Sequence, residues 1–384
     1  MTGIQPFHIE IPEARLDDLK DRIARTRWPR ELQGAGWSRG VPLQYLRELT
    51  DYWATGFDWR AEEAKLNALP QFVTEIDGQP IHFVHALSPE PDALPLIITH
   101  GYPGSIVEFA DIIGPLTNPR AHGGDPADAF HVVTASLPGF AFSTPVGETG
   151  WAVGRTAKAL AELMRRLGYQ RYAAQGGDIG AGVAGALGAI DPMHVVGVHI
   201  NSDPMAVNWL LDRFPFDLSA LPEGDRRALD AVRAHGADGI GYLKLQSTRP
   251  QTVAYALNDS PVGQLAWIAE KFEEWTDLAK RRTGPAIDRD RLLANVSLYW
   301  FTESGASAAQ FLYEAAHSAQ DWGMPSTVPQ GWALFAAQGF VRKILDPDRK
   351  IAHWSEFEEG GHFAAMETPD LLAGDVRAFF RPLR

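Results

Sequence analysis

The feature that most constrains the fold is an alternation of short apolar runs with helical segments in the middle of the chain. The runs at residues 94–99, 130–135 and 172–175 have the length and composition of buried strands, and a helical segment follows each of them. Parallel strands need long crossovers, which are usually helices. The alternation therefore predicts an α/β fold, with a mostly parallel sheet covered by helices on both faces.

Helical spacing of apolar residues dominates the start of the chain. Three stretches show it, at residues 11–30, 43–53 and 59–69, so residues 1–70 are predicted to form an N-terminal helical arm. Strand patterns begin only afterwards, at 72–76 and 81–85, with an Asp77-Gly78 hairpin signal between them.

A long gap separates the last strands of the sheet. After the strand predicted at residues 195–201, no strand pattern follows for over a hundred residues, and helical spacing recurs instead. Residues 204–325 are therefore predicted to form a helical lid inserted into the sheet domain. The α/β core is predicted over residues 71–203 and 326–384, with the last strands at 332–336 and 351–357.

Composition narrows the classes of function. The 48 Asp and Glu residues outnumber the 35 Lys and Arg, and the net charge of −13 disfavours binding to nucleic acid. No leader pattern or long apolar run is visible, so a cytoplasmic protein without a membrane anchor is expected. The absence of Cys leaves only oxygen or nitrogen nucleophiles, and the scattered His residues suggest no metal site. No cofactor is expected.

The most informative motif is QGGDIGA at residues 175–181, which lies between a predicted strand and a helix rich in small residues. A sharp strand-to-helix turn of this kind lifts its central residue above the sheet and leaves no room for neighbouring side chains. Here the central residue is Asp178, whose carboxylate can attack carbon to form an ester. An ordinary alternative is that Asp178 caps the helix that follows.

Two distant segments favour the catalytic interpretation of Asp178. HGYP at residues 100–103 follows an earlier strand and can direct backbone N–H groups to the same point. GGHF at residues 360–363 follows the last strand and brings the imidazole of His362 there. The order of nucleophile before His is that of the α/β-hydrolase fold.

With these motifs in place, the sequence resembles the microsomal-type epoxide hydrolases over nearly its whole length. The motifs that carry the resemblance are FHIEIP at 7–12, RWP at 27–29, FDWR at 57–60, HGYPGS at 100–105, ALNDSP at 256–261 and GGHFAA at 360–365. The mammalian members of that family carry an N-terminal membrane anchor, which is not visible in this sequence.

The resemblance implies a two-step reaction. Asp178 would attack an epoxide carbon to form an alkyl ester, and His362 would activate water to hydrolyse that ester. The backbone N–H groups of Tyr102 and Ile179 would stabilise the oxyanion of the second step. Tyr242 matches the first of two lid tyrosines that protonate the opening oxygen in this family.

Two positions depart from the family pattern. Leu312 stands where the second lid tyrosine is expected, and its neighbour Tyr313 is the candidate replacement, although one residue rotates a helical side chain by about 100°. Gln338 stands where an acid should orient His362, and an amide cannot supply the negative charge. Asp203, just after the strand at 195–201, is the favoured relocated acid; Asp346 and Asp348 are weaker candidates.

The leading hypothesis is therefore hydrolysis of a small-molecule epoxide, with a bulky apolar or aromatic group, by water. The departures at Leu312 and Gln338 leave open a specialised enzyme that opens epoxides by cyclisation, rearrangement or coupling, and also a relative that binds without turnover. Haloalkane dehalogenation is disfavoured, because Ile179 replaces the usual halide-binding Trp. A homo-oligomer is compatible with the sequence, which does not specify the oligomeric state.

Overall fold

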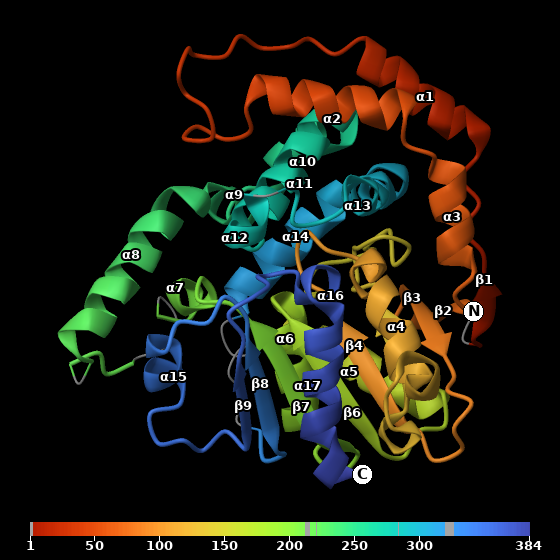
Figure 1. Cartoon of the computed structure of the whole chain (residues 1–384). Coiled ribbons are helices and arrows are strands. Elements are labelled where there is room, and N and C mark those ends of the chain that lie inside the picture. Colours follow the sequence, from red (N-terminus) through yellow and green to blue (C-terminus); the bar gives the residue numbers. More distant parts are fainter. Residues whose placement is uncertain (1–2, 212–215, 220, 283, 319–325) are drawn as a thin grey trace.

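A twisted sheet forms the centre of the molecule in the computed structural model, which describes residues 3–211, 216–219, 221–282, 284–318 and 326–384 (Figure 1). Within that part of the chain, the strand order is β1-β2-β3-β5-β4-β6-β7-β8-β9. The strands are β1 (Gln5–Phe7), β2 (Gln71–Ile76), β3 (Gln79–Ala86), β4 (Leu94–Thr99), β5 (Phe130–Ala135), β6 (Tyr172–Gly177), β7 (Val195–Ser202), β8 (Gln330–Leu334) and β9 (His353–Glu356). Strands β4 to β9 are mutually parallel, as the alternation predicted. The antiparallel edge strand β1 was not expected.

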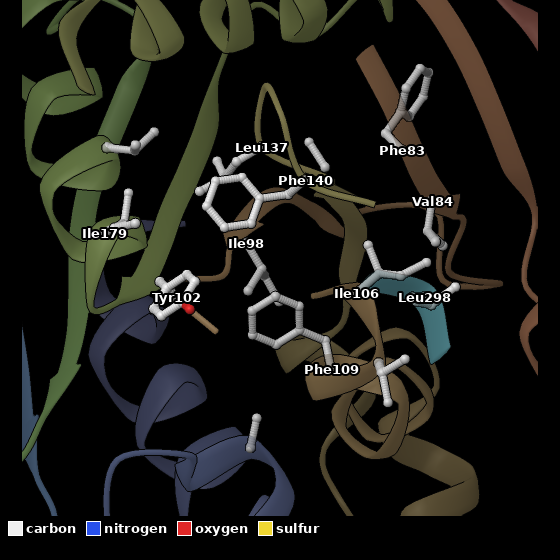
Figure 2. Close-up of a cluster of buried hydrophobic side chains, with 14 of the residues drawn as sticks. Phe83, Val84, Ile98, Tyr102, Ile106, Phe109, Leu137, Phe140, Ile179 and Leu298 are labelled. Atoms are coloured by element: carbon white, nitrogen blue, oxygen red, sulfur yellow. The ribbon is translucent and has the colours of Figure 1, made fainter. Parts of the chain in front are cut away.

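Helices cover both faces of the sheet. Helices α4 (Ala110–Thr117) and α17 (Pro369–Phe380) pack together on one face, and α5 (Val153–Arg166) and α6 (Ile179–Ile190) pack together on the other. Figure 2 shows part of the buried core, in which rings such as Phe109 and Phe140 meet aliphatic side chains such as Ile98. Burying each such side chain contributes roughly 1.5–3 kcal/mol.

The N-terminal helices α1 (Glu13–Ala24), α2 (Leu43–Thr55) and α3 (Trp59–Asn67) pack on helices from the segment between β7 and β8, not on the sheet alone. Trp53 in α2 donates its indole N–H to the Ser297 hydroxyl at 2.9 Å. Tyr45 donates its hydroxyl to Glu273 at 2.8 Å. These contacts brace the helices that lie above the sheet edge.

The segment between β7 and β8 forms helices wherever the structure describes it. They are α7 (Ala206–Leu211), α8 (Glu223–Gly239), α9 (Gly241–Gln246), α10 (Pro250–Asp259), α11 (Pro261–Trp275), α12 (Leu278–Arg281), α13 (Arg289–Thr302) and α14 (Ser304–His317). We call α7 to α14 the lid helices; they lie above the carboxyl ends of the parallel strands in Figure 1. The predicted end of the lid, residues 319–325, lies outside the described residues. The division of the chain at residues 70, 203 and 325 stays a prediction.

The remaining elements are short or connect the strands. They are α15 (Phe340–Leu345), α16 (Ala364–Glu367) and the 3₁₀ turns η1 (Ile106–Phe109), η2 (Pro119–His122), η3 (Pro126–Asp128) and η4 (Arg381–Leu383). Among the described helices, none combines the length and the apolar character that crossing a bilayer requires.

The strand register brings the ends of the parallel strands level with one another. Thr99 of β4 pairs with Gly176 of β6, and Gly177 pairs with Asn201 of β7. Leu334 of β8 lies between Ser202 of β7 and Glu356 of β9. The segments that follow these strands therefore start at one edge of the sheet, the usual location of a ligand site in such folds.

Candidate active site

Asp178 occupies a sharp turn between β6 and α6. Its backbone angles, φ 55° and ψ −126°, lie outside the regions that non-glycine residues normally adopt. Such geometry persists only when the surrounding structure holds it, and it is concentrated at functional sites. Asp178 occupies the N-cap position of α6, as the alternative expected, but its side chain makes no capping hydrogen bond to that helix.

Close packing explains why glycines surround Asp178. A Cβ atom on Gly180 would lie 2.0 Å from the Thr99 carbonyl oxygen, and one on Gly176 would lie 2.2 Å from the carbonyl oxygen of Gly180. A Cβ on Gly101 would lie 2.2 Å from an oxygen of the Asp178 carboxylate itself. The small residues of the motif therefore allow α6 to approach β4 closely, and this approach fixes the turn.

The loop after β4 meets the Asp178 carboxylate. The backbone N–H of Tyr102 donates to Asp178 Oδ1 at 2.9 Å. Lid helix α13 holds this loop, because Asn295 donates to the Pro103 carbonyl at 2.8 Å and the Tyr299 hydroxyl donates to the Gly104 carbonyl at 2.9 Å. Ile179 is the first residue of α6, where backbone N–H groups lack partners within the helix.

His362 and Asp203 complete a chain of charged groups. His362 Nδ1 lies 2.9 Å from Asp203 Oδ2, and its Nε2 lies 3.7 Å from Asp178 Oδ2. The backbone N–H of His362 donates to the Trp275 carbonyl at the end of α11 at 2.9 Å. Asp203, which follows β7, is therefore the acid in contact with His362 Nδ1, and its role as the orienting acid stays a prediction.

The charges around His362 alter its proton affinity. Burial by itself would lower the pKa of His362, but the hydrogen bond to Asp203 and the charges of Asp203, Asp178 and Glu108 outweigh it. The result is a pKa of about 9, so the imidazolium form prevails near neutral pH. A cation then lies between two carboxylates in the unliganded site.

Tyr242 lies across the cavity from the sheet edge, on lid helix α9. Its ring stacks on Tyr102 with a centroid distance of 5.7 Å and an interplanar angle of 8°, and it contacts Trp275 at 5.4 Å. Burial raises the pKa of Tyr242 well above 10, and the charges of Asp178, Glu274 and Asp203 add to that effect. The phenol is therefore held in its protonated form, able to donate.

A cavity of about 690 Å³ joins these groups. Asp178, Asp203, His362 and Tyr242 all line it, and most of the remaining wall is apolar. That wall includes Ile179, Ile200, Ile240, Leu243, Trp275, Leu312 and Trp332. Within the described part of the chain, no cluster of three or more acidic or His side chains is arranged to hold a metal ion.

Gln338 does not belong to this site. It is exposed just before α15, and the Nδ1 atom of His362, which it was expected to orient, contacts Asp203 instead. The other acid candidates serve the local structure: Asp346 accepts from the backbone N–H of Lys350 at 2.6 Å, and Asp348 pairs with the Lys350 side chain. The acid in contact with His362 therefore follows β7, whereas Gln338 follows β8.

Tyr313 also lies elsewhere. Leu312 lines the cavity and Tyr313 does not; the Tyr313 ring stacks on His317, one helical turn later, at 4.1 Å. The reason is the rotation of about 100° between successive residues of a helix. The expectation that Tyr313 replaces the second lid tyrosine is therefore wrong in this structure.

Glu108 in η1 is a site residue that sequence reasoning missed. Its side chain is buried, with Oε2 only 2.5 Å from where a Cβ on Gly104 would lie. Burial raises the pKa of Glu108 to about 8, opposed by the charge of His362 and reinforced by those of Asp178 and Glu367. Glu108 was hard to recognise from sequence, because Ser105 followed by Glu108 has the ordinary pattern of a helix cap.

Three features together define an α/β-hydrolase: the sharp strand-to-helix turn at Asp178, the contacts of His362 with Asp178 and Asp203, and the order of strands in the sheet. The chain matches the family described as "alpha/beta hydrolase fold" over residues 95–369 and the one described as "Epoxide hydrolase N terminus" over residues 4–109. It therefore belongs to the epoxide hydrolase family, as the following relatives also indicate.

Similar proteins cover nearly the whole chain. A Stigmatella aurantiaca protein named "Putative epoxide hydrolase" is 47% identical, over 100% of this chain and 86% of its own. Epoxide hydrolase 1 of Sus scrofa is 34% identical, over 98% of this chain and 88% of its own. The solved structure of Aspergillus niger epoxide hydrolase is 30% identical, covers 100% of this chain and 97% of its own, and has a TM-score of 0.83.

Proposed function

We propose that this protein hydrolyses epoxides to vicinal diols through a covalent ester on Asp178. In the first step an Asp178 oxygen attacks one epoxide carbon, the ring C–O bond breaks, and the Tyr242 hydroxyl gives its proton to the leaving oxygen. The observation that carries the proposal is the chain from Asp178 through His362 to Asp203, which faces Tyr242 across one cavity.

In the second step His362 takes a proton from water as the water oxygen attacks the ester carbonyl. The tetrahedral oxyanion is stabilised by the N–H of Tyr102, which already donates to Asp178 Oδ1, and by the N–H of Ile179. Loss of one such donor costs about 2.7–4 kcal/mol in comparable enzymes. On collapse the bond between the carboxyl carbon and the alkoxy oxygen breaks, and the His362 imidazolium gives its proton to that oxygen, which releases the diol. The carboxyl proton passes to His362, which leaves the Asp178 carboxylate with one solvent oxygen.

The charges of the site suit this order of events. In the free enzyme the His362 imidazolium pairs with Asp178, the group that attacks the epoxide carbon. Ester formation removes the negative charge of Asp178, which is one of the charges that raise the pKa of His362. The imidazolium then loses its proton more readily. That proton returns through solvent to the Tyr242 phenolate left by the first step, so His362 becomes the neutral base for the second.

The cavity indicates the class of substrate. Its volume of about 690 Å³ and its largely apolar wall suit an epoxide with a bulky apolar or aromatic substituent. Leu312 adds apolar surface where a second phenol was expected, so Tyr242 is left as the proton donor on the lid side.

The test is the intact mass of the protein after mixing with an excess of a styrene-oxide-type epoxide, with diol formation followed in parallel. A substrate-sized mass gain in the wild type, absent in Asp178→Asn, is the expected result. Turnover should fall by about 10⁴-fold or more in that variant, as for other removed nucleophiles. In ¹⁸O-water, one ¹⁸O should enter Asp178 and then the diol.

Two outcomes would contradict the proposal. Undiminished turnover by Asp178→Asn would exclude the ester, and a cyclised or isomerised product without solvent oxygen would indicate a specialised epoxide-opening enzyme instead.

A further inference from the structure

Lys271 in α11 is a buried cation next to the proposed active site. Only 2% of its side chain is exposed, which is rare for lysine. Its ammonium nitrogen lies 2.7 Å from Glu270 Oε2, 3.0 Å from Glu274 Oε2 and 3.4 Å from the Gly239 carbonyl oxygen. The ammonium thus donates hydrogen bonds to Glu274 and to the Gly239 carbonyl and forms an ion pair with Glu270, which meets the condition for burying such a charge.

The ammonium faces the aromatic ring of Tyr242. The Lys271 nitrogen lies 4.9 Å from the centroid of the Tyr242 ring and 5.7 Å from that of Trp275. Its contact with Gly239 joins α11 to the end of α8, three residues before Tyr242 in the chain. Lys271 thus touches both the ring of Tyr242 and the backbone that leads into it.

This position matters because the charges that act most strongly on Tyr242 belong to acidic groups, while the His362 imidazolium lines the same cavity. Asp178 follows β6, Asp203 follows β7, and Glu274 lies on α11, and all three oppose loss of the phenolic proton. As Tyr242 protonates the opening epoxide, its ring gains negative charge. A buried cation near that ring stabilises the developing charge more effectively than an exposed one, because little water screens it.

We propose that Lys271 is a positioning residue for Tyr242: it fixes the phenol at the cavity and stabilises the charge that the phenol develops in the ring-opening step. This inference rests on the proposed function and goes beyond it, because it assigns a role to a residue that does not line the cavity.

The experiment measures ester formation and ester hydrolysis separately, by rapid-quench single turnovers with a styrene-oxide-type epoxide. Lys271→Met should slow ester formation about tenfold, the size expected for a desolvated cation near an aromatic ring. Ester hydrolysis should change by less than about twofold, because it depends on His362 and Asp203. Lys244→Met, which removes an exposed lysine on α9, is the matched control and should leave both steps unchanged.

A double-mutant cycle separates this role from a general structural one. If Lys271 acts through Tyr242, Lys271→Met should have no further effect on ester formation in the Tyr242→Phe background. Equal slowing in both backgrounds, or equal slowing of ester formation and ester hydrolysis, would overturn the inference.

Glu274→Gln provides a second test that does not leave the buried ammonium unpaired, because Glu270 remains. It removes one negative charge near Tyr242, so ester formation should become faster, opposite in sign to Lys271→Met. Slower or unchanged ester formation in Glu274→Gln would contradict the inference. This test remains valid even if Lys271→Met fails to fold. A wild type that forms no ester would reject the proposed function itself, whereas a wild type that forms ester at the same rate as Lys271→Met would reject only this inference.

Discussion

The two walls of the cavity are built in different ways. On the sheet side, Asp178, Asp203 and His362 each follow the carboxyl end of a parallel strand, and the register of the sheet brings them together. On the lid side, Tyr242, Leu312 and Trp275 come from α9, α14 and α11, and their directions depend on how each helix packs.

This difference explains which functional residues can stand at another position of the sequence and still face the cavity. Residues that follow neighbouring strands all start at the same sheet edge, so Asp203 after β7 reaches His362 although the acid was expected after β8. A shift of one residue along a helix turns the side chain away from the cavity, as it does for Tyr313. A functional side chain on the sheet side can therefore move to a neighbouring strand and still face the cavity. A functional side chain on the lid side cannot move by one residue along its helix without turning away.

The prediction with the largest expected effect tests whether Asp203, and not Gln338, is the acid that acts on His362. Asp203→Asn should slow ester hydrolysis by about 10³- to 10⁴-fold, because His362 loses the charge that orients it and stabilises its cation. Accumulation of the ester, detected by intact mass, is the measurement. Gln338→Ala is the matched control and should retain full activity, since Gln338 is exposed and away from the site. A large loss in Gln338→Ala would reverse the assignment of the acid.

The next prediction tests how tightly the sheet wall is packed. Gly180→Ala should lower the free energy of unfolding by about 3 kcal/mol or more, because its Cβ would lie 2.0 Å from the Thr99 carbonyl oxygen. Gly185→Ala, in the same helix, has no atom near its added Cβ and should stabilise the protein by up to about 1 kcal/mol. Urea unfolding of both variants gives the comparison; similar stabilities would argue against the close approach of α6.

A smaller effect tests the lid wall. Tyr242→Phe should slow ester formation about 10²-fold, at the lower end of the effects of a removed general acid. Tyr313→Phe should change that rate by less than about twofold, because the Tyr313 ring does not line the cavity. Single-turnover rates measure both. Equal losses in the two variants would mean that α14 turns when substrate binds.

The smallest expected effect is the dependence of the protein's stability on pH that His362 causes. Because the pKa of His362 is raised to about 9, the stability that this group contributes is fully present below about pH 6.5 and is lost as pH rises through 9. Asp203→Asn should lower the pKa of His362 and weaken this dependence on pH. NMR titration of the His362 ring and unfolding at several pH values would show it. An unchanged titration would mean that Asp203 does not interact with His362 in solution.

Much of the sheet wall could be predicted from local sequence. The strands at Leu94–Thr99 and Phe130–Ala135 and the helix at Pro369–Phe380 have the predicted bounds, because their apolar periods are strong and turn residues flank them. Asp178 could be recognised as an exposed turn residue from its glycine neighbours. The short strand Gln5–Phe7 was missed, because pairing with β2 decides it, and three residues carry no usable period.

The sequence by itself determined the α/β fold, the turn at Asp178 and the family, because each depends on local periods, obligatory glycines or contiguous motifs. Only the tertiary structure decided that Asp203 and not Gln338 contacts His362, that Leu312 and not Tyr313 faces the cavity, and that Glu108 and Lys271 lie near the reacting groups. The physical reason is that these contacts depend on distances between segments that are remote in the chain. They also depend on which side of each helix faces the cavity, and the packing of the helix decides that.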